Sequence, residues 1–373
     1  MDKDPRQGTD YPALHEFTDD IYTCNRTRCG FCREECPIYR VKRLETYSSR
    51  GRMLVARGLV EGILEPSAEI QEVMDDCLMC GYCQARCALN NLDIFSAVRR
   101  EMRAAGFVSA KHEKTAAKIL EEGTLFDRPT PSLGGRAGTV PLYLGCAYQS
   151  QPQEVQTIVS VLDKVGLDPL VSDEVCCSYI VGATGFEGEY EQAQAHFRQV
   201  YGPYLDDQIL TVCPTCTVTL RDEYGLNVKH ALVAVAEKLA EKQIKPLNLT
   251  KIPVRGKVAY HDPCHLGRML GVYEEPRQIL KALGVELVEM EHNRTFSTCC
   301  GGGGGVLDVD RNLAVEVSKN RVRDAVAVGA QTMVTACPTC RPTLLRGAGR
   351  LANELGYFVD VLDLWEMLDR ALD

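Results

Sequence analysis

The stretch Cys337-Pro338-Thr339-Cys340 and its twin, Cys213-Pro214-Thr215-Cys216, decide how this chain of 373 residues is organised. Each closes a set of five cysteines, in which one lone cysteine and then an adjacent pair come first. The first set is Cys146, Cys176, Cys177, Cys213 and Cys216, and the second is Cys264, Cys299, Cys300, Cys337 and Cys340. From the pair to the next cysteine the interval is 36 residues in the first set and 37 in the second. A five-thiol pattern used twice predicts two copies of one metal-cluster module.

The composition of the chain argues against several classes of protein. A net charge of −9 without a basic tail argues against a nucleic-acid-binding protein. The N-terminus lacks the apolar core of a signal peptide, and no run of about 18 apolar residues predicts a membrane span. Eighteen cysteines without an export signal favour thiolate ligands over disulfides, the alternative being a cysteine-rich extracellular protein. We expect a cytoplasmic protein, either free or held at the inner face of the membrane through a partner protein.

Two cysteine quartets near the N-terminus have the spacing of a two-cluster ferredoxin. Both end in C-x2-C-x3-C, and in such ferredoxins the fourth cysteine of each run ligates the other cluster. This predicts one cubane [4Fe-4S] cluster on Cys24, Cys29, Cys32 and Cys87, and a second on Cys77, Cys80, Cys83 and Cys36. The sequence departs from the usual pattern twice, because four residues separate Cys24 from Cys29 and Ala88 stands where a proline is usual. Zinc is the alternative metal, since C-x2-C pairs also form zinc ribbons.

Apolar periodicity predicts the secondary structure around these cysteines. Met53, Leu54, Leu59 and Leu64, and later Ile94, Val98 and Met102, recur at helical spacing between and after the quartets. Beyond residue 139, short apolar strands alternate with amphipathic helices, which indicates small α/β units with parallel strands. Each C-x2-C then follows a strand and begins a helix, where free N–H groups favour thiolates.

These patterns predict an α+β multidomain protein. It begins with a mainly helical two-cluster ferredoxin domain, and two repeated small α/β modules related by pseudo-twofold symmetry follow. The expected limits are 1–20 for an N-terminal arm, 21–127 for the ferredoxin domain, 128–139 for a linker, 140–245 for the first module and 254–373 for the second.

The glycine run 301–305 does not indicate nucleotide binding, because the Gly-Lys-Ser/Thr of a P-loop is missing. We expect the glycines to let the backbone approach the metal, with N–H groups directed at sulfur. His261 and His265 flank Cys264 and are either ligands, proton donors or, more commonly for such histidines, structural residues. Asp262 before Pro263 is most simply a turn residue.

From Cys24 onwards the chain resembles the CCG-domain iron–sulfur family, which includes the catalytic subunit of heterodisulfide reductase. The resemblance rests on three motifs, which are His-Asp-Pro-Cys-His-Leu-Gly-Arg at 261–268, Cys-Cys-Gly-Gly-Gly-Gly-Gly-Val at 299–306 and Ala-Cys-Pro-Thr-Cys at 336–340. It implies a non-cubane [4Fe-4S] cluster in each module, with all ten module cysteines as ligands of two catalytic clusters. Ser178 stands where the family has glycine after the first cysteine pair, so the resemblance covers the second module's cluster more fully than the first's.

The resemblance implies a disulfide reductase, with coenzymes M and B as the two thiols of the substrate. Two cubane clusters would relay single electrons to the paired module clusters, between which the disulfide is reduced. The alternative is an electron-transfer subunit of a glycolate, lactate or glycerol-3-phosphate dehydrogenase that passes electrons to quinone. A related reductase acting on a protein-bound sulfur species is a third reading. No flavin or nicotinamide motif is present, so the expected partner is a membrane cytochrome b-type protein or a soluble flavoprotein.

Overall fold

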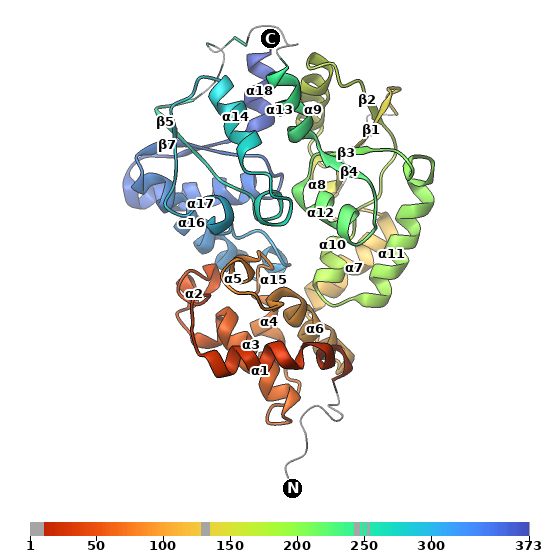
Figure 1. Cartoon of the computed structure of the whole chain (residues 1–373), viewed down its shortest axis with the longest axis vertical. Coiled ribbons are helices and arrows are strands. Elements are labelled where there is room, and N and C mark those ends of the chain that lie inside the picture. The colour runs from red at the N-terminus through yellow and green to blue at the C-terminus, as the bar shows by residue number, and fades with distance from the viewer. Residues whose placement is uncertain are drawn as a thin grey trace.

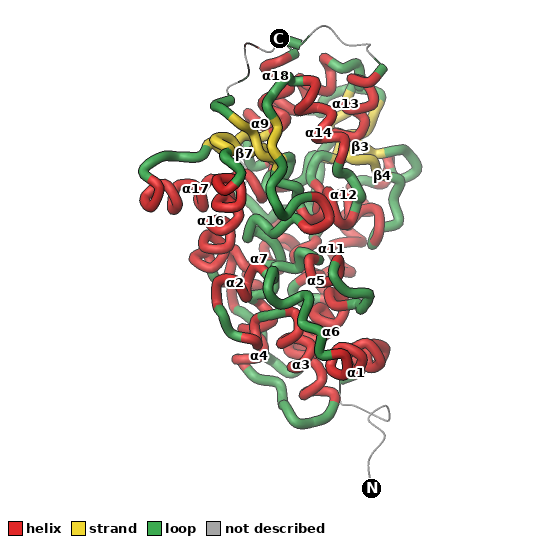
Figure 2. The backbone as a smooth tube through the Cα atoms, turned by 60° about the vertical axis from the view of Figure 1, so that its left-hand side comes forward, coloured by secondary structure: helices red, strands yellow, loops and turns green. Residues whose placement is uncertain are grey.

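The computed structural model describes residues 11–127, 135–241, 247–248, 250, 252 and 254–372. A helical N-terminal region lies below two units that each contain a parallel sheet (Figure 1). Figure 2 shows the strands confined to these two units, with helices and loops making up the rest. This is the predicted α+β arrangement of a helical domain followed by two α/β repeats.

The N-terminal region is built from short helices, and its own apolar core is formed mainly by α1 (Thr18–Thr27), α3 (Ser49–Val60), α4 (Ala68–Asp75) and α6 (Asn91–Ala104). Its other elements are η1 (Pro12–Phe17), α2 (Pro37–Lys42), η2 (Glu45–Tyr47), α5 (Tyr82–Ala85) and α7 (Ala110–Glu122), of which α2 packs on the second module and α7 on the first. Met53, Ile94 and Met102 are buried in this core, as their spacing predicts. Leu54 and Leu64 are exposed instead, because α3 turns Leu54 outward and ends before Leu64.

Part of the expected N-terminal arm belongs to this packed region. Leu14 is fully buried in the core, and the backbone N–H of Ala13 donates to the Glu101 carboxylate at 2.6 Å. The packed region therefore begins before the arm boundary expected at residue 20. Residues 1–10 lie outside the described part of the chain.

The first module carries a four-stranded parallel sheet in the order β2-β1-β3-β4. Its strands are β1 (Val140–Tyr143), β2 (Pro169–Val171), β3 (Ile209–Thr211) and β4 (Val228–His230). Its helices are α8 (Cys146–Gln149), α9 (Pro152–Lys164), α10 (Tyr179–Ala183), α11 (Glu187–Val200), α12 (Pro214–Asp222) and α13 (Ala231–Ala240), with η3 at Gly202–Tyr204. Gly166 follows α9 with a φ of 77°, which is the conformation expected of a glycine that ends a helix.

The second module repeats this topology in a second parallel sheet, in the order β6-β5-β7-β8. Its strands are β5 (Lys257–Tyr260), β6 (Leu287–Val288), β7 (Ala330–Thr335) and β8 (Asp360–Asp363). Its helices are α14 (Glu274–Ala282), α15 (Val306–Val309), α16 (Arg311–Ala327), α17 (Cys340–Leu355) and α18 (Leu364–Ala371), with η5 (His265–Met269) and η6 (Arg294–Phe296). Identical strand order in both sheets confirms the predicted repeat.

The two modules share one hydrophobic core. Helix α18 packs on α9 of the first module, and α13 packs on α14 of the second (Figure 1). Trp365, the single tryptophan, is fully buried in this shared core. Burying a large aromatic side chain contributes on the order of 3 kcal/mol. The core therefore holds the carboxyl ends of both sheets in a fixed relation.

The two expected inter-domain stretches are partly built into the first module and the shared core. Within the predicted linker, residues 128–134 lie outside the described residues, whereas Arg136 pairs with Val171 through two backbone hydrogen bonds. Of the stretch around 242–253, Leu247 and Ile252 pack against the shared core. Arg136 thus adds an isolated antiparallel bridge beside Val171 of the first sheet, and the linker boundaries remain a prediction.

Acid is expected to destabilise the fold through His230. Its Nε2–H donates to the Val212 carbonyl at 3.0 Å, its Nδ1 accepts from the Leu232 N–H, and burial lowers its pKa to about 4. Because the unfolded chain binds this proton near pH 6.5, stability is full above that pH and is lost as the pH falls towards 4. We expect a loss of about 2 kcal/mol between pH 7 and pH 5. Denaturant unfolding at both pH values measures it, and an unchanged pH slope in His230→Gln would contradict it.

Candidate functional site

All ten cysteines of the two five-cysteine sets line one cavity between the modules. Its volume is about 400 Å³. Tyr179 and Ile180 of the first module and His265 of the second also line it. The lone cysteines follow β1 and β5, and the C-x2-C stretches follow β3 and β7, so all of them meet at the carboxyl ends of the central strands. In open α/β sheets this edge is where ligands bind.

In the first module the backbone holds the thiols close together. The Sγ atoms of Cys146 and Cys176 lie 3.5 Å apart. A Cβ at Gly145 would lie 2.9 Å from the Cys216 sulfur, so a side chain there would displace a thiol. The Glu174 carboxylate accepts from the N–H groups of Leu144 and Gly145 at 2.8 and 2.9 Å, which fixes the turn before Cys146.

In the second module, backbone N–H groups are directed at sulfur, as expected for the glycine run. Gly301 donates to the Cys299 sulfur and Gly302 to the Cys300 sulfur, both at 3.4 Å. Hydrogen bonds from the Cys299 and Cys340 thiols, and the nearby His261 ring, hold the pKa of Cys300 well below its usual range. This environment stabilises a thiolate, the form in which cysteine binds metal.

The serine at position 178, where the family has glycine, leaves the backbone geometry beside the first cysteine pair intact. Ser178 has a φ of 59°, and its N–H donates to the Cys176 sulfur at 3.3 Å, which matches the contact that Gly301 makes in the second module. A Cβ at Gly301 would lie 2.3 Å from the Ala314 carbonyl oxygen, so glycine is required there. Serine is therefore compatible with the cluster-facing turn of the first module.

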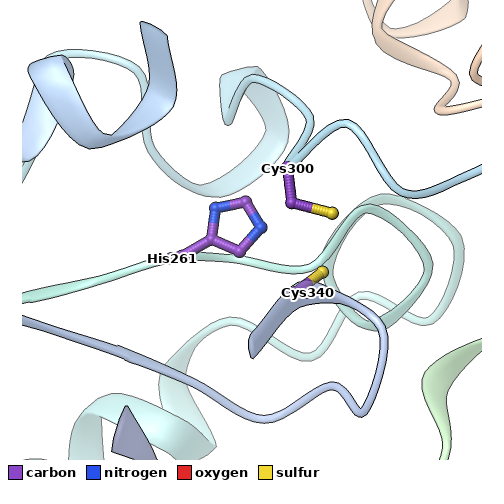
Figure 3. A group of neighbouring side chains, drawn as sticks. All are labelled: His261, Cys300 and Cys340. Atoms are coloured by element: carbon purple, nitrogen blue, oxygen red, sulfur yellow. The ribbon is translucent and has the colours of Figure 1, made fainter. Parts of the chain in front are cut away.

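His261 lies beside the sulfur atoms of Cys300 and Cys340 (Figure 3). The three residues offer ligand atoms that all lie within 4.8 Å of one another. Arg321 is always protonated, and its Nε donates to the Nδ1 of His261 at 3.1 Å. The neutral ring must then carry its proton on Nε2, which is buried and has no hydrogen-bond partner among the described residues.

This tautomer bears on whether His261 is an iron ligand or a hydrogen-bond donor. A metal-bound histidine binds through one nitrogen and donates from the other, whereas Nδ1 of His261 accepts from Arg321. The geometry therefore favours a hydrogen-bond donor to sulfur over an iron ligand. His265 differs, since its Nδ1 lies 3.4 Å from the Cys264 sulfur and its ring packs edge-on against Tyr179 of the first module.

Several buried charged residues support the site, and the motifs alone do not reveal them. Asp262, expected to be a turn residue, forms a buried ion pair with Arg277 at 2.7 Å and accepts from the Arg294 N–H at 2.8 Å. Arg268 donates to the carbonyl oxygens of Cys80 and Ser297. These pairings join residues far apart in the chain, so no local pattern in the sequence announces them.

The ferredoxin quartets come together in the crossed manner expected. Burial, and then the nearby charges of Cys32, Cys87 and Cys29, raise the pKa of Cys24 to about 11. Burial and then the charges of Cys80, Cys77 and Cys36 raise the pKa of Cys83. Each group of four thiols is thus a set of spatial neighbours, and their assignment as cluster ligands remains a prediction.

The second quartet lies directly against the second module. The neighbouring Cys299 thiol lowers the pKa of Cys80 to about 7, and both side chains belong to one buried cluster. A Cβ at Gly303 would lie 2.6 Å from the Leu78 carbonyl oxygen, and one at Gly304 would lie 2.2 Å from that of Cys77. The glycine run therefore also brings the module against the ferredoxin domain, a role that its sequence alone did not indicate.

Arg99 joins all three parts of the chain at this junction. Its guanidinium is fully buried and donates to the carbonyl oxygens of Met74 and Cys77 in the ferredoxin domain. It also donates to those of Ala183 in the first module and Gly304 in the second. One side chain thus fixes the ferredoxin domain against both modules.

Comparison with models of protein families shows to which class of protein the chain belongs. A model of the cysteine-rich CCG domain matches residues 140–221 and 258–344, and a model of the 4Fe-4S dicluster domain matches residues 20–91. The chain is therefore a CCG-domain iron–sulfur protein with an N-terminal dicluster ferredoxin domain. The dicluster match also favours iron–sulfur clusters over zinc.

Similar individual proteins indicate which kind of iron–sulfur protein the chain resembles. The chain is 26% identical over 392 residues to one subunit of the dihydromethanophenazine:CoB–CoM heterodisulfide reductase of Methanosarcina barkeri, covering 92% of this chain and 93% of that one. It is 29% identical over 386 residues to one subunit of the fumarate reductase (CoM/CoB) of Methanothermobacter marburgensis, covering 96% and 74%. It is 29% identical over 249 residues to the EtfAB:quinone oxidoreductase of Syntrophomonas wolfei, covering 62% and 34%. The chain thus resembles iron–sulfur oxidoreductases. No helix in its described part is long and apolar enough to cross a membrane.

Proposed function

We propose that this chain is the catalytic subunit of a disulfide reductase, which reduces a disulfide to two thiols. The observation that carries the proposal is the single cavity lined by all ten module cysteines. A cavity shared by two thiol sets lets both sulfurs of a disulfide be engaged at once. An electron relay needs no such shared cavity, although the quinone oxidoreductase among the relatives keeps the relay as the alternative.

The cysteines fit iron–sulfur clusters. All eighteen thiols are free, and the buried Nε2 of His261 lacks a partner among the described residues, beside two of those thiols. We infer two cubane clusters on the eight ferredoxin cysteines and two non-cubane clusters on the ten module cysteines. Such clusters accept single electrons and bind thiolate sulfur when present. Their partner in electron supply would be a cytochrome b-type membrane protein or a soluble flavoprotein, which would place the chain in the cytoplasm or at the inner face of the membrane.

The protein side chains have defined tasks in this proposal. Cys80 of the second quartet and Cys299 of the second module lie in one buried cluster, so electrons would reach the cavity by that route. The Nε2 of His261 lies near the sulfurs of Cys300 and Cys340, to which it would donate when they hold a cluster, and the apolar wall around Tyr179 and Ile180 limits water at the reacting sulfurs. The modules thereby provide a mainly apolar, two-sided site.

His261→Phe is expected to lower the reduction potential of the second module's cluster selectively. The ring shape is retained, but the donor to sulfur is lost, and hydrogen bonds to the sulfurs help set such potentials. The first module has Tyr143 at the corresponding position, and its hydroxyl donates to the Val175 carbonyl instead. Redox titration followed by EPR measures the effect, and His261→Gln, which retains a donor, should lie closer to the unaltered protein. Equal potentials in all three proteins would rule out the donor role.

The cavity wall predicts an anionic substrate, such as the heterodisulfide of coenzymes M and B named for the relatives. Arg311 and Arg346 line the cavity, and no ion pair joins either to a carboxylate in the part of the chain that the structure describes. Arg346→Gln should raise KM for an anionic disulfide about tenfold, equivalent to about 1.4 kcal/mol, with kcat nearly unchanged. Arg350→Gln, one turn further along α17 and outside the cavity, is the matched control. Equal KM values for the two variants would remove the assignment.

Anaerobic turnover with a chemical reductant tests the proposed function. The reconstituted protein, reduced by a viologen dye, is given the heterodisulfide, and released thiols are counted against electrons consumed. We expect two thiols for every two electrons, and no turnover in Cys337→Ser. Quinone reduction without thiol release from any disulfide would establish the relay instead.

A further inference from the structure

Cys29 differs from every other cysteine of the chain in its exposure. It is exposed, whereas the other seventeen are buried or intermediate. Phe31, two residues further on, is 74% exposed, although burying such a side chain is favourable. The thiol nearest to solvent and an exposed aromatic ring thus occupy one short loop.

Positive charge surrounds this loop. A hollow of about 490 Å³ is lined by Arg28, Arg50 and Arg86 together with Cys29 and Phe31. No ion pair joins Arg28 or Arg86 to a carboxylate within the described ranges, and Arg50 reaches Glu45 only at 3.8 Å. The acidic side chains at the hollow have cationic partners of their own. Glu34 and the nearby Glu45 are paired with Arg33, and Glu35 lies 3.5 Å from Arg40. The net charge of the side chains around the hollow is therefore positive.

The loop is held in place before any partner arrives. Arg28 adopts a φ of 51° and Gly30 a φ of 70°, which makes the turn tight. The Arg50 side chain donates to the Arg28 carbonyl oxygen at 3.2 Å and ties the loop to α3. Arg86 packs 4.0 Å over the ring of Phe296. A preorganised surface loses little entropy when a partner binds.

We propose that the face formed by Arg28, Cys29, Phe31, Arg50 and Arg86, the Phe31 face, docks an acidic one-electron carrier protein. Arginine and exposed aromatic side chains are enriched at protein interfaces, and complementary charge steers association. The acidic carrier would neutralise the arginines, cover the Phe31 ring and transfer one electron to the cluster that Cys29 ligates. The carrier is oxidised and that cluster reduced, with no bond made or broken. The inference rests on the proposed function only in requiring a cluster at Cys29.

A lipid surface is the competing occupant, because arginine and phenylalanine also bind anionic membranes. The position of Cys29 favours the protein carrier, since lipid headgroups supply no electron to the neighbouring cluster. Because the carrier protein and the lipid surface are both negatively charged, the experiment measures binding of each.

Stopped-flow reduction of the oxidised holoprotein tests the proposal. The probe is a reduced, acidic plant-type [2Fe-2S] ferredoxin, and dithionite serves as a small reductant that needs no docking. We expect the second-order rate constant with ferredoxin to fall with rising salt, at least tenfold in the double variant Arg28→Glu/Arg86→Glu, and several-fold in Phe31→Ala. Reduction by dithionite, and disulfide turnover driven by it, should stay unchanged in the same variants. The double variant Arg350→Glu/Arg370→Glu, at exposed positions of α17 and α18, changes the net charge by the same amount and should react normally.

Three outcomes would overturn the proposal. One is an unaltered ferredoxin rate in both the charge-reversal and Phe31→Ala variants. Another is an equal loss of rate in the double variant Arg350→Glu/Arg370→Glu, which would reflect overall charge. The third is binding to vesicles of phosphatidylglycerol and phosphatidylcholine that the double variant abolishes while its ferredoxin rate is unaltered. Failure of disulfide turnover with dithionite would count against the proposed function and leave the docking rates interpretable.

Discussion

Replacing Gly304 by alanine is expected to separate the ferredoxin domain from the second module. The new Cβ would lie 2.2 Å from the Cys77 carbonyl oxygen and 2.6 Å from the Leu78 carbonyl carbon, and the backbone φ of 62° adds strain of about 1 kcal/mol. Both neighbours are backbone atoms of the second quartet's loop, so no side chain can move aside. We expect either a loss of several kcal/mol in stability or a displaced loop. In both cases electron transfer from the second quartet's cluster to the second module should fall strongly.

Gly349→Ala is the matched control for this substitution. Gly349 lies within α17, and a Cβ there would meet nothing within 4 Å. Alanine should stabilise that helix by up to about 1 kcal/mol. Denaturant unfolding and the rate of disulfide reduction with electrons supplied through the ferredoxin domain are the two measurements. If Gly304→Ala behaves like Gly349→Ala in both, the glycine run does not depend on this close contact.

Replacing Arg99 by methionine is expected to have an effect of similar size. The substitution leaves the carbonyl oxygens of Met74, Cys77, Ala183 and Gly304 without the donor that they share in the buried junction. Each unsatisfied buried acceptor costs about 1–3 kcal/mol, so a loss of at least about 3 kcal/mol is expected after relaxation. Because these acceptors belong to all three parts of the chain, the junction should loosen as a unit.

The neighbouring Arg100 provides the control for Arg99. It is only partly buried on the same helix α6, and Arg100→Met should change stability by less than about 1 kcal/mol. Unfolding midpoints and iron retention in the purified proteins measure both effects. Comparable values for Arg99→Met and Arg100→Met would show that the junction does not depend on the buried guanidinium.

The elements that depend on local pattern were predictable from the sequence. The strands before Cys213 and Cys337 lie where the apolar runs place them, and Met53, Ile94 and Val98 are buried as their spacing indicates. The parallel pairing and the repeat also follow, because strand and helix alternate in the same order twice. Leu54 and Leu64 are exposed instead, since Leu54 lies on the outward face of α3 and α3 ends before Leu64.

The contacts that support the site could not be predicted from the sequence, because they depend on residues that are neighbours only in the folded chain. Asp262 reads as a turn residue until Arg277 is placed beside it, and Arg99 reads as one more arginine on a helical face. The glycine run was expected to face metal, and its packing against Cys77 and Leu78 needed the position of a domain that lies far earlier in the chain. The tautomer of His261 likewise follows only from the position of Arg321.

The central claim is that a module cluster binds a sulfur substrate in the shared cavity, and EPR tests it most directly. The anaerobically purified protein is oxidised with and without candidate thiols, including coenzymes M and B, and spectra are recorded. We predict a paramagnetic state that appears only with a thiol and is lost in Cys337→Ser. If thiols change nothing, and only the signals of ordinary cubane clusters appear on reduction, the disulfide reductase assignment is contradicted and the chain is an electron relay.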